Sequence, residues 1–254
     1  MVGQIPKELV EELRKAKKVG VLTGAGISAE SKIPTFRDAM TGLWASFSPE
    51  ELATPEAFAR NPRMVWDWYA FRRDMCAKAL PNPGHLALAE LEKRYEQFTL
   101  TTQNVDGLHQ RAGSHHVLEV HGSFRRLRCL DCGGEEGIES LFSRFSEADL
   151  DSPPRCLRCG STKLKPDVVL FGESLPAAFQ TAEAEARSAD VMLVMGTSLN
   201  VYPVAGLVPL AKRNGAKLVI LNREPTVFDE DADLVIHREL GTVSRELISM
   251  LGLG

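Results

Sequence analysis

Short apolar runs alternate with helix-like segments along most of this chain. In DVMLVMG and AKLVILN the apolar residues are continuous, which predicts strands buried on both faces, as in a parallel sheet covered by helices. We expect strands at Val19–Thr23, Phe98–Thr101, Val117–Val120, Val168–Phe171, Val191–Met195, Lys217–Leu221 and Leu234–Ile236. We expect helices near Pro6–Lys17, Gly84–Arg94, Val105–Ala112, Ala177–Ser188, Val204–Asn214 and Thr242–Leu251. This order of elements predicts an α/β fold with a doubly wound parallel sheet.

Two stretches interrupt the alternation of strands and helices. Residues from about 39 to 80 have a helical pattern and contain all three tryptophans, and residues from about 123 to 165 are polar and contain four of the five cysteines. We interpret both as insertions that together form a smaller domain over the carboxyl edge of the sheet. The predicted large domain then comprises residues 1–38, 81–122 and 166–254, and the smaller one a helical module (39–80) and a cysteine-rich module (123–165).

Composition and charge narrow the class of protein. The 254 residues are 44% hydrophobic and 25% charged, which is typical of a globular protein. The net charge of −4 argues against nucleic acid as a partner, although Arg125, Arg126 and Arg128 form a local basic patch that could meet an anion. No apolar run approaches the roughly 20 residues that cross a bilayer, and the charged amphipathic N-terminus lacks the apolar segment of a secretory signal. We therefore expect a cytoplasmic protein with no membrane partner.

A glycine-rich turn follows the first predicted strand, in VGVLTGAGISAESKIPTFR. Gly24, Gly26 and Ala29 fit the pattern G-x-G-x-x-(G/A), in which backbone N–H groups approach a pyrophosphate at a helix start. A glycine turn between any strand and helix gives the same pattern. The acidic residue expected about twenty positions later would fall near Glu50 and Glu51, in a segment that reads as helix and turn. The phosphate cradle is therefore ordinary, whereas the polar segment after it is not.

The cysteines form two pairs with metal-ligand spacing. Cys129-x-x-Cys132 and Cys156-x-x-Cys159 are separated by 23 residues, and each pair is followed by glycine. Two such knuckles predict one tetrahedral zinc ion whose four thiolates leave no open position, so the metal is structural. Two disulfides are the alternative, which a reducing compartment disfavours. The remaining thiol, Cys76, is expected to be a small buried hydrophobe on a helix.

Polar clusters follow several predicted strands, where open α/β sheets bind ligands. They are Thr101–His109 (TTQNVDGLH), Val120–Ser123 (VHGS), Gly196–Ser198 and Asn222–Glu224. Each cluster alone also fits turn and helix-cap chemistry. Histidines outside these motifs are expected to be core residues, namely His85, His115, His116 and His237.

Taken in order, these motifs resemble the sirtuin family of NAD-dependent protein lysine deacylases over essentially the full chain. The matching text is GAGISAES-IPTFR, TQNVDGLH, the histidine of EVHGS, the two CxxC pairs, VVLFGE, GTSLNVYP and LNRE. The resemblance implies a Rossmann-like NAD domain and a smaller domain made of a helical module and a zinc ribbon. It also implies that acyl-lysine peptide binds in the cleft between them, and we expect a monomer.

The resemblance also implies roles for individual residues. NAD would be held by Gly24, Ala25, Gly26, Ser28, Ile33, Phe36, Arg37, Gln103, Asn104, Asp106, Gly196, Thr197, Ser198, Asn222 and Glu224. Asn104 and His121 would be catalytic, with His121 as general base because imidazole accepts a proton near neutral pH. The products would be nicotinamide, O-acyl-ADP-ribose and free lysine. Lys32 departs from the family's text, because it stands where glycine is usual.

One helical segment bears on the acyl group. Tyr69 and Arg72 are three residues apart and so share a helix face, where the guanidinium could bind a carboxylate. This spacing resembles that of the sirtuin branch that removes succinyl and malonyl groups, and we expect a preference for such acidic groups with some deacetylation. Val168 and Phe171 are expected to contact substrate. The alternative is that Arg72 pairs with a carboxylate of the protein itself.

Two other functions fit the same motifs. A mono-ADP-ribosyltransferase would use the NAD site with another nucleophile, and a non-catalytic zinc-ribbon protein would bind nucleic acid and only sense NAD. The acidic net charge argues against the second of these functions.

Overall fold

A six-stranded parallel sheet forms the larger part of the molecule. The computed structural model describes residues 5–34, 48–138 and 154–253. The strand order is β3-β2-β1-β7-β8-β9, and every neighbouring pair is parallel. The strands are β1 Lys18–Thr23, β2 Gln97–Thr102, β3 Val117–Glu119, β7 Val191–Met195, β8 Lys217–Leu221 and β9 Leu234–Ile236. Six of the seven strands expected from the sequence are present, and the α/β prediction is confirmed.

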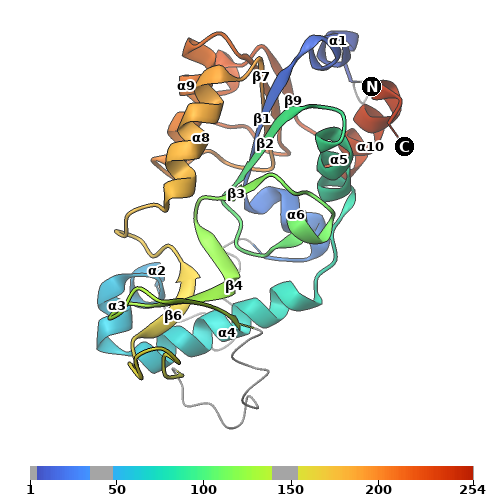
Figure 1. The fold of residues 1–254 in the computed structure, drawn as a ribbon. Helices are drawn as coiled ribbons and strands as arrows, with labels where there is room; N and C mark the ends of the chain where they lie inside the picture. Colours follow the sequence, from blue (N-terminus) through green and yellow to red (C-terminus); the bar gives the residue numbers. More distant parts are fainter. Residues whose placement is uncertain (1–4, 35–47, 139–153, 254) are drawn as a thin grey trace.

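Helices cover both faces of this sheet (Figure 1). Alternate residues of one strand enter different cores: Val191 and Leu193 pack on one face, and Met192 and Val194 on the other. The first core is closed by α1 Lys7–Lys15, α5 Pro83–Glu92 and α10 Leu240–Leu251, and the second by α8 Ala177–Ser188 and α9 Leu207–Arg213. Strands covered on both sides need apolar residues at every position, which explains the continuous runs.

Two expected elements differ from the structure. Val168–Phe171 is not a strand of the large sheet: Val168 ends β6 Leu164–Val168, which pairs antiparallel with β4 Gly122–Cys129. Beyond it, Val169 N–H donates to His121 O at 3.0 Å and Phe171 N–H to Ala53 O at 2.8 Å, so these amides bond to loops. The helix expected at Val105–Ala112 is only α6 Leu108–Arg111, because Gly107 is left-handed with φ +72°.

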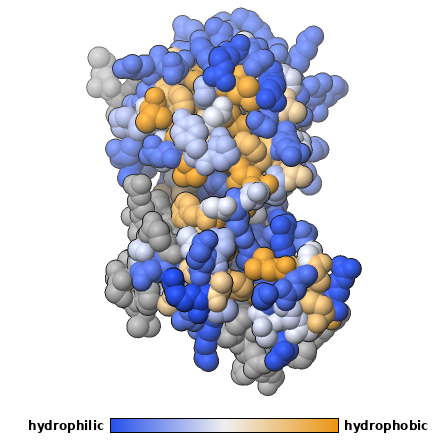
Figure 2. Space-filling view, turned by 90° about the vertical axis from the view of Figure 1, so that its left-hand side faces the viewer, coloured by the Kyte–Doolittle hydropathy of each residue, from blue (hydrophilic) through white to orange (hydrophobic). Residues whose placement is uncertain are grey.

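A smaller part of the molecule lies below the large sheet in Figure 1. Its sheet has the order β5-β4-β6, with β5 at Glu135–Gly137, and its helices are α2 Pro49–Leu52, α3 Pro55–Arg60 and α4 Pro62–Lys78. The domain boundaries given above stay a prediction. The surface narrows between the two parts, and apolar residues are visible around this waist (Figure 2).

Helix α4 joins the two hydrophobic clusters of the smaller part. Asn61 caps its start by accepting from Met64 N–H at 3.1 Å, and Pro62 fits the first helical position. Its Val65, Tyr69 and Cys76 side chains pack in one cluster with Phe124, Val168 and Leu170. Trp66 packs in the other, beside Cys129 and Cys156. Cys76 is buried on this helix as expected, with its pKa raised to about 12 by burial.

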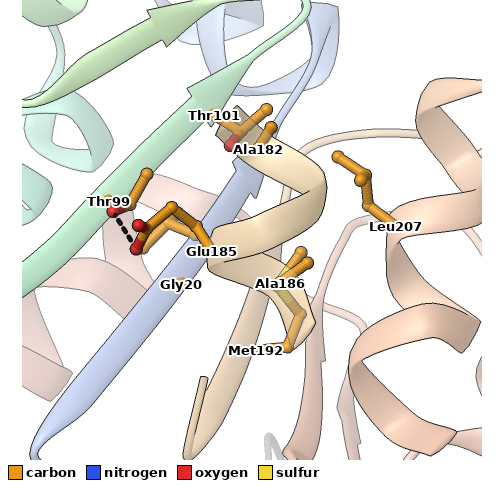
Figure 3. A pocket seen from close by; sticks show the side chains of 9 residues that line it. Gly20, Thr99, Thr101, Ala182, Glu185, Ala186, Met192 and Leu207 are labelled. Carbon is orange, nitrogen blue, oxygen red and sulfur yellow. Dashed lines mark hydrogen bonds between the residues drawn. The ribbon is translucent and has the colours of Figure 1, made fainter. Parts of the chain in front are cut away.

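Helix α8 lies against β1 and β2 in a mainly apolar interface, where Glu185 makes two polar contacts. The Thr99 hydroxyl donates to Glu185 at 3.0 Å (Figure 3). Lys18 Nζ lies 2.9 Å from the same carboxylate. A cavity of about 10 Å³ beside these groups is lined by Gly20, Val21, Thr101, Ala182 and Met192, among others. That volume approaches the space of one water molecule, so it cannot hold a cofactor.

Among the described residues, no helix is long and apolar enough to cross a membrane.

The turn after β1 and the end of β7 touch through glycines. A Cβ on Gly26 would lie 2.8 Å from Gly196 O, and a Cβ on Gly24 would lie 2.7 Å from Thr197 Cβ. Gly196 has φ +63°, and a Cβ there would meet the backbone nitrogen of Ile27. The glycines of this turn are therefore required for the close approach of two strand ends.

We predict that Gly196→Ala destabilises the protein by about 2–4 kcal/mol, because it adds left-handed strain to a backbone clash. Gly206→Ala is the matched control, since Gly206 has helical φ −64° and no atom lies within 4 Å of the added Cβ. Urea unfolding without NAD measures both. Equal free energies of unfolding for the two variants would contradict the role of Gly196.

Candidate active site and metal centre

The carboxyl ends of the parallel strands bring the polar clusters to one edge of the sheet. Thr23 ends β1 and Thr102 ends β2, and their hydroxyls are hydrogen bonded at 2.9 Å. Both side chains are buried. The Thr102 hydroxyl also accepts from Asn104 N–H at 3.1 Å, so it supports the segment that follows β2.

Ser28 is the centre of a buried hydrogen-bond network. Its hydroxyl donates to Asp106 Oδ2 at 2.8 Å and accepts from Asn104 Nδ2 at 3.1 Å. Asn104 Nδ2 also donates to Gly24 O at 3.0 Å, which fixes the glycine turn to the segment after β2. Burial raises the pKa of Asp106, and the hydrogen bonds from Leu108 N–H and Ser28 oppose that shift. The structure thus brings Gly24, Ser28, Asn104 and Asp106 together.

Gln103 joins this network to two other strand ends. Its Nε2 donates to the Thr197 hydroxyl at 3.0 Å, after β7. The backbone carbonyl oxygen of Gln103 lies 3.2 Å from His121 Nδ1. A carbonyl only accepts, so His121 Nδ1 carries a proton and, in the neutral ring, the lone pair is on Nε2. Burial lowers the pKa of His121, which favours that neutral form.

His121 occupies the turn where the chain leaves the large sheet for the small one. Gly122 follows with φ +81°, and a Cβ there would meet Asp167 O of β6. An ion-pair network spans the same crossing: Arg126 donates to Glu119 at 2.8 Å and to Asp167 at 3.0 Å. The position of the imidazole is therefore set by both sheets.

Two buried histidines next to the Ser28 network were not assigned a role from the sequence. His109 Nε2 lies 3.0 Å from the Thr23 hydroxyl, and His85 Nε2 lies 3.4 Å from the Ser28 hydroxyl. The two rings lie 4.8 Å apart. Burial lowers the pKa of His85 to about 4 and that of His109 to about 3, so both rings are neutral near pH 7. The signal in the sequence for His109 was its place in the TTQNVDGLH cluster after β2.

The expectation that the other histidines are core residues is confirmed for His85 and wrong for His115, His116 and His237. These three are exposed, because they lie in loops at the sheet's rim. His116 contacts Glu92 at 2.7 Å, and His237 contacts Asp229 at 2.9 Å.

The third polar cluster continues along the same edge at β7 and β8. Gly196 N–H donates to Leu221 O at 3.0 Å, which joins the ends of the two strands. Asn222 is buried and donates to Glu224 O at 2.6 Å. The side chains of Ser198 and Glu224 are exposed to solvent. This end of the edge thus offers an accessible hydroxyl and an accessible carboxylate.

The glycine turn offers backbone donors at the same edge. It continues as a 3₁₀ helix, η1 Ala25–Ser31, whose first hydrogen bond runs from Ile27 N–H to Gly24 O at 3.1 Å. The N–H groups of Ala25 and Gly26 precede that bond and have no acceptor within the turn. Such donors beside exposed Ala25 fit the pyrophosphate of a dinucleotide. Phe36 and Arg37 lie outside the described residues, and Lys32 is left-handed with φ 62°.

Tyr69 and Arg72 share the face of α4 that packs on β4. The Arg72 guanidinium lies 4.8 Å from the Trp68 ring and 5.7 Å from the Phe124 ring. Burial raises the pKa of Tyr69, while the charge of Arg72 opposes the shift. The charge of Asp106 opposes the lowering of the Arg72 pKa by burial. Since Asp106 accepts a hydrogen bond from Ser28, this face lies next to the Ser28 network. Ile33 and Val168 are buried in the Tyr69 cluster, whereas Phe171 is 54% exposed.

The four cysteines of the small sheet converge on one point. Cys129 Sγ lies 3.6 Å from Cys159 Sγ, Cys132 Sγ lies 3.8 Å from Cys156 Sγ, and all four sulfurs lie within 4.8 Å of one another. Tetrahedral zinc–thiolate bonds of about 2.3 Å place the sulfurs about 3.8 Å apart. The sulfur positions therefore fit one structural zinc ion, and all five thiols are free of disulfides.

The basic patch expected at Arg125, Arg126 and Arg128 is largely neutralised. Arg126 pairs with Glu119 and Asp167, and Arg128 lies 3.0 Å from Glu135 and 3.2 Å from Asp167. Arg126 and Arg128 therefore already have carboxylate partners within the chain, and anion binding at this patch stays a prediction.

We predict that the wild-type protein binds one zinc ion per chain. Cys132→Ser and Cys156→Ser should each lose it, because three thiolates hold the ion far more weakly than four. After dialysis against a chelator, the metal content of each variant should fall at least about tenfold. Cys76→Ala is the control, since Cys76 lies on α4 outside the cluster. Mass spectrometry of the metal in purified protein measures this. Full occupancy in both serine variants would contradict the four-thiolate site.

Known proteins match the chain over most of its length. The model of the Sir2 family matches residues 24–203. An NAD-dependent protein deacylase of Ralstonia nicotianae is 53% identical over 230 residues, covering 90% of each chain. One of Aquifex aeolicus is 48% identical over 231 residues, covering 91% of this chain and 93% of the relative.

Solved structures agree with this assignment. The crystal structure of a Sir2 homologue in complex with NAD is 41% identical, with a TM-score of 0.89 over 99% of this chain and 96% of the other. Sir2Af2 bound to a myristoylated histone peptide is 41% identical, with a TM-score of 0.77 over 96% and 95% of the chains. This chain belongs to the Sir2 family.

Proposed function

We propose that this chain, an NAD-dependent protein deacylase, prefers lysine side chains with succinyl, malonyl or related acidic acyl groups and retains some deacetylase activity. The observation that carries the preference is the buried Arg72 guanidinium, which lies close to the Trp68 and Phe124 rings on the same helix face as Tyr69. The substrates are acyl-lysine proteins or peptides.

The residues at the sheet edge are proposed to hold NAD along its length. The N–H groups of Ala25 and Gly26 bind the pyrophosphate, and Glu224 and Ser198 face the adenosine half. At the other end, Gln103, Asn104 and Asp106 bind the nicotinamide and its ribose, with Ile33 beside them. Gly24, Ser28, Gly196, Thr197 and Asn222 hold this arrangement together, and Phe36 and Arg37 complete the site from outside the described residues.

His121 is the proposed general base and Asn104 a second catalytic residue. When bound, NAD supplies the ribose to which the acyl group is transferred as nicotinamide leaves. His121 Nε2 accepts a proton from a ribose hydroxyl, while Nδ1–H donates to Gln103 O and keeps the ring oriented. Asn104 is fixed by hydrogen bonds to Gly24 O and Ser28, and its side chain would help to orient the same ribose. One water molecule is consumed in this reaction, and the products would be nicotinamide, O-acyl-ADP-ribose and free lysine.

Two physical arguments support an acidic acyl group at Arg72. Burial lowers the pKa of Arg72, but a guanidinium stays charged, so a carboxylate beside it is stabilised electrostatically. Tyr69 lies on the same helix face and can donate its hydroxyl to that carboxylate, because burial raises the pKa of Tyr69 and keeps it protonated. Val168 packs in the same cluster as Tyr69, Phe171 is exposed, and both are proposed to contact the substrate.

We predict that His121→Ala lowers kcat/KM for deacylation by about 10²–10⁴-fold, the usual contribution of a general base. His116→Ala, which removes an exposed imidazole, should leave it unchanged. Because burial lowers the pKa of His121, the base stays neutral below its ordinary value, and wild-type activity should fall only at pH below about 6.5. A pH profile of kcat/KM measures this. Loss of activity already between pH 8 and 7 would contradict the buried, neutral imidazole.

We predict that Arg72→Met costs about 1.5–3 kcal/mol of transition-state stabilisation on succinyl-lysine peptide, from the loss of a charge-assisted hydrogen bond. On acetyl-lysine peptide the loss should be much smaller. Arg73→Met is the matched control, because Arg73 lies 2.9 Å from Asp74 on the same helix. The measurement is kcat/KM on succinyl, acetyl and myristoyl peptides of one sequence. Equal losses on succinyl and acetyl peptides would remove the carboxylate role.

A further inference from the structure

A buried ammonium group lies at the edge of the small sheet. The Lys165 side chain on β6 is only 5% exposed. Its Nζ donates to Val168 O at 2.7 Å, to Pro166 O at 3.4 Å and to Glu173 Oε2 at 3.2 Å. Burial lowers the pKa of Lys165, while the Glu173 charge opposes that shift. Burying an ammonium costs free energy unless it is paired, and here Glu173 and two carbonyl oxygens are its partners.

Glu173 closes the other end of the same segment. Its Oε2 also accepts from Leu170 N–H at 2.8 Å, and Glu173 N–H donates to Leu170 O at 3.0 Å. The segment from Val168 to Glu173 contains no strand beyond Val168, so these polar contacts replace a sheet ladder. The pair therefore fixes the backbone at both ends of residues 168–173.

This segment lies between the proposed base and the acyl-binding face. Val169 N–H donates to His121 O at 3.0 Å, and Phe171 N–H donates to Ala53 O between α2 and α3 at 2.8 Å. Val168 and Leu170 pack in the same cluster as Tyr69 and Phe124. A displacement of the segment would change the distance between the substrate contacts and His121.

We propose that the Lys165–Glu173 ion pair is a positioning pair that holds residues 168–171 in the geometry that the acyl-lysine substrate requires. Neither side chain contacts the reacting atoms. The proposal rests on the proposed function, because it assigns Val168 and Phe171 to the substrate. The charges are needed because an ammonium can donate to two carbonyls and a carboxylate at once, which fixes three points of one short segment.

The test compares Glu173→Gln and Lys165→Met with wild type in the full chain. Glu173→Gln keeps an oxygen that can accept from Leu170 N–H but removes the charge, and Lys165→Met keeps most of the side-chain volume. We expect each variant to raise KM for the acyl-lysine peptide about tenfold, with KM for NAD and kcat changed by less than about threefold. The double variant should be about as impaired as either single one, because both remove the same interaction.

Lys163→Met is the matched control, because Lys163 is two residues away and forms an exposed ion pair with Asp131 at 2.9 Å. It should leave KM for the peptide unchanged. An unchanged peptide KM in both Glu173→Gln and Lys165→Met would overturn the proposal. So would equal increases of KM for peptide and NAD together with a lower Tm, since these indicate a general loss of structure.

Hydrogen exchange separates this proposal from the proposed function. In both variants the amides of Val169, Leu170 and Phe171 should exchange at least about tenfold faster, while the amides of β4 keep their protection. If wild type does not deacylate any peptide, the proposed function fails. In that case two measurements still decide whether the pair positions this segment. They are the exchange rates of these amides and the Kd of the acyl-lysine peptide, each compared between wild type and the variants. Unchanged exchange at these three amides would refute the pair's role in either case.

Discussion

The close approach of two strand ends is the constraint on which the rest of the site depends. Gly26 of the turn after β1 lies against Gly196 at the end of β7, and a side chain at either position would separate them. Because all strands of the large sheet are parallel, the polar segments after β1, β2, β7 and β8 lie along one edge. Hydrogen bonds from Asn104 and Gln103 then join these segments into one surface.

The second constraint is the turn between β3 and β4, where the chain passes from the large sheet to the small one. His121 lies in that turn, Gly122 allows β4 to pass close to Asp167, and Arg126 connects Glu119 of β3 with Asp167 of β6. The proposed base is thus held between the part that binds NAD in this account and the part that carries Tyr69 and Arg72. The four-cysteine cluster lies at the far end of the same small sheet, where Cys129 ends β4.

The sequence predicted the large sheet well, because strands covered on both faces leave continuous apolar runs. It also predicted the metal cluster, since the spacing of Cys129, Cys132, Cys156 and Cys159 is a local signal. The prediction of a strand of the large sheet failed at Val168–Phe171. Here the apolar residues lead from the end of β6 into a loop, which is held by hydrogen bonds from the Lys165 side chain and to the His121 backbone. The buried pair His85 and His109 was also not assigned a role, because their contacts with Ser28 and Thr23 join residues far apart in the chain.

The most direct test of the central claim is product analysis by mass spectrometry of wild-type protein with NAD and a succinyl-lysine peptide. We expect nicotinamide and O-succinyl-ADP-ribose in equal amounts with free lysine, formed with higher kcat/KM than the products from the matching acetyl peptide. Transfer of ADP-ribose to protein without an acylated ADP-ribose product, or no consumption of NAD with any acylated lysine, would contradict it.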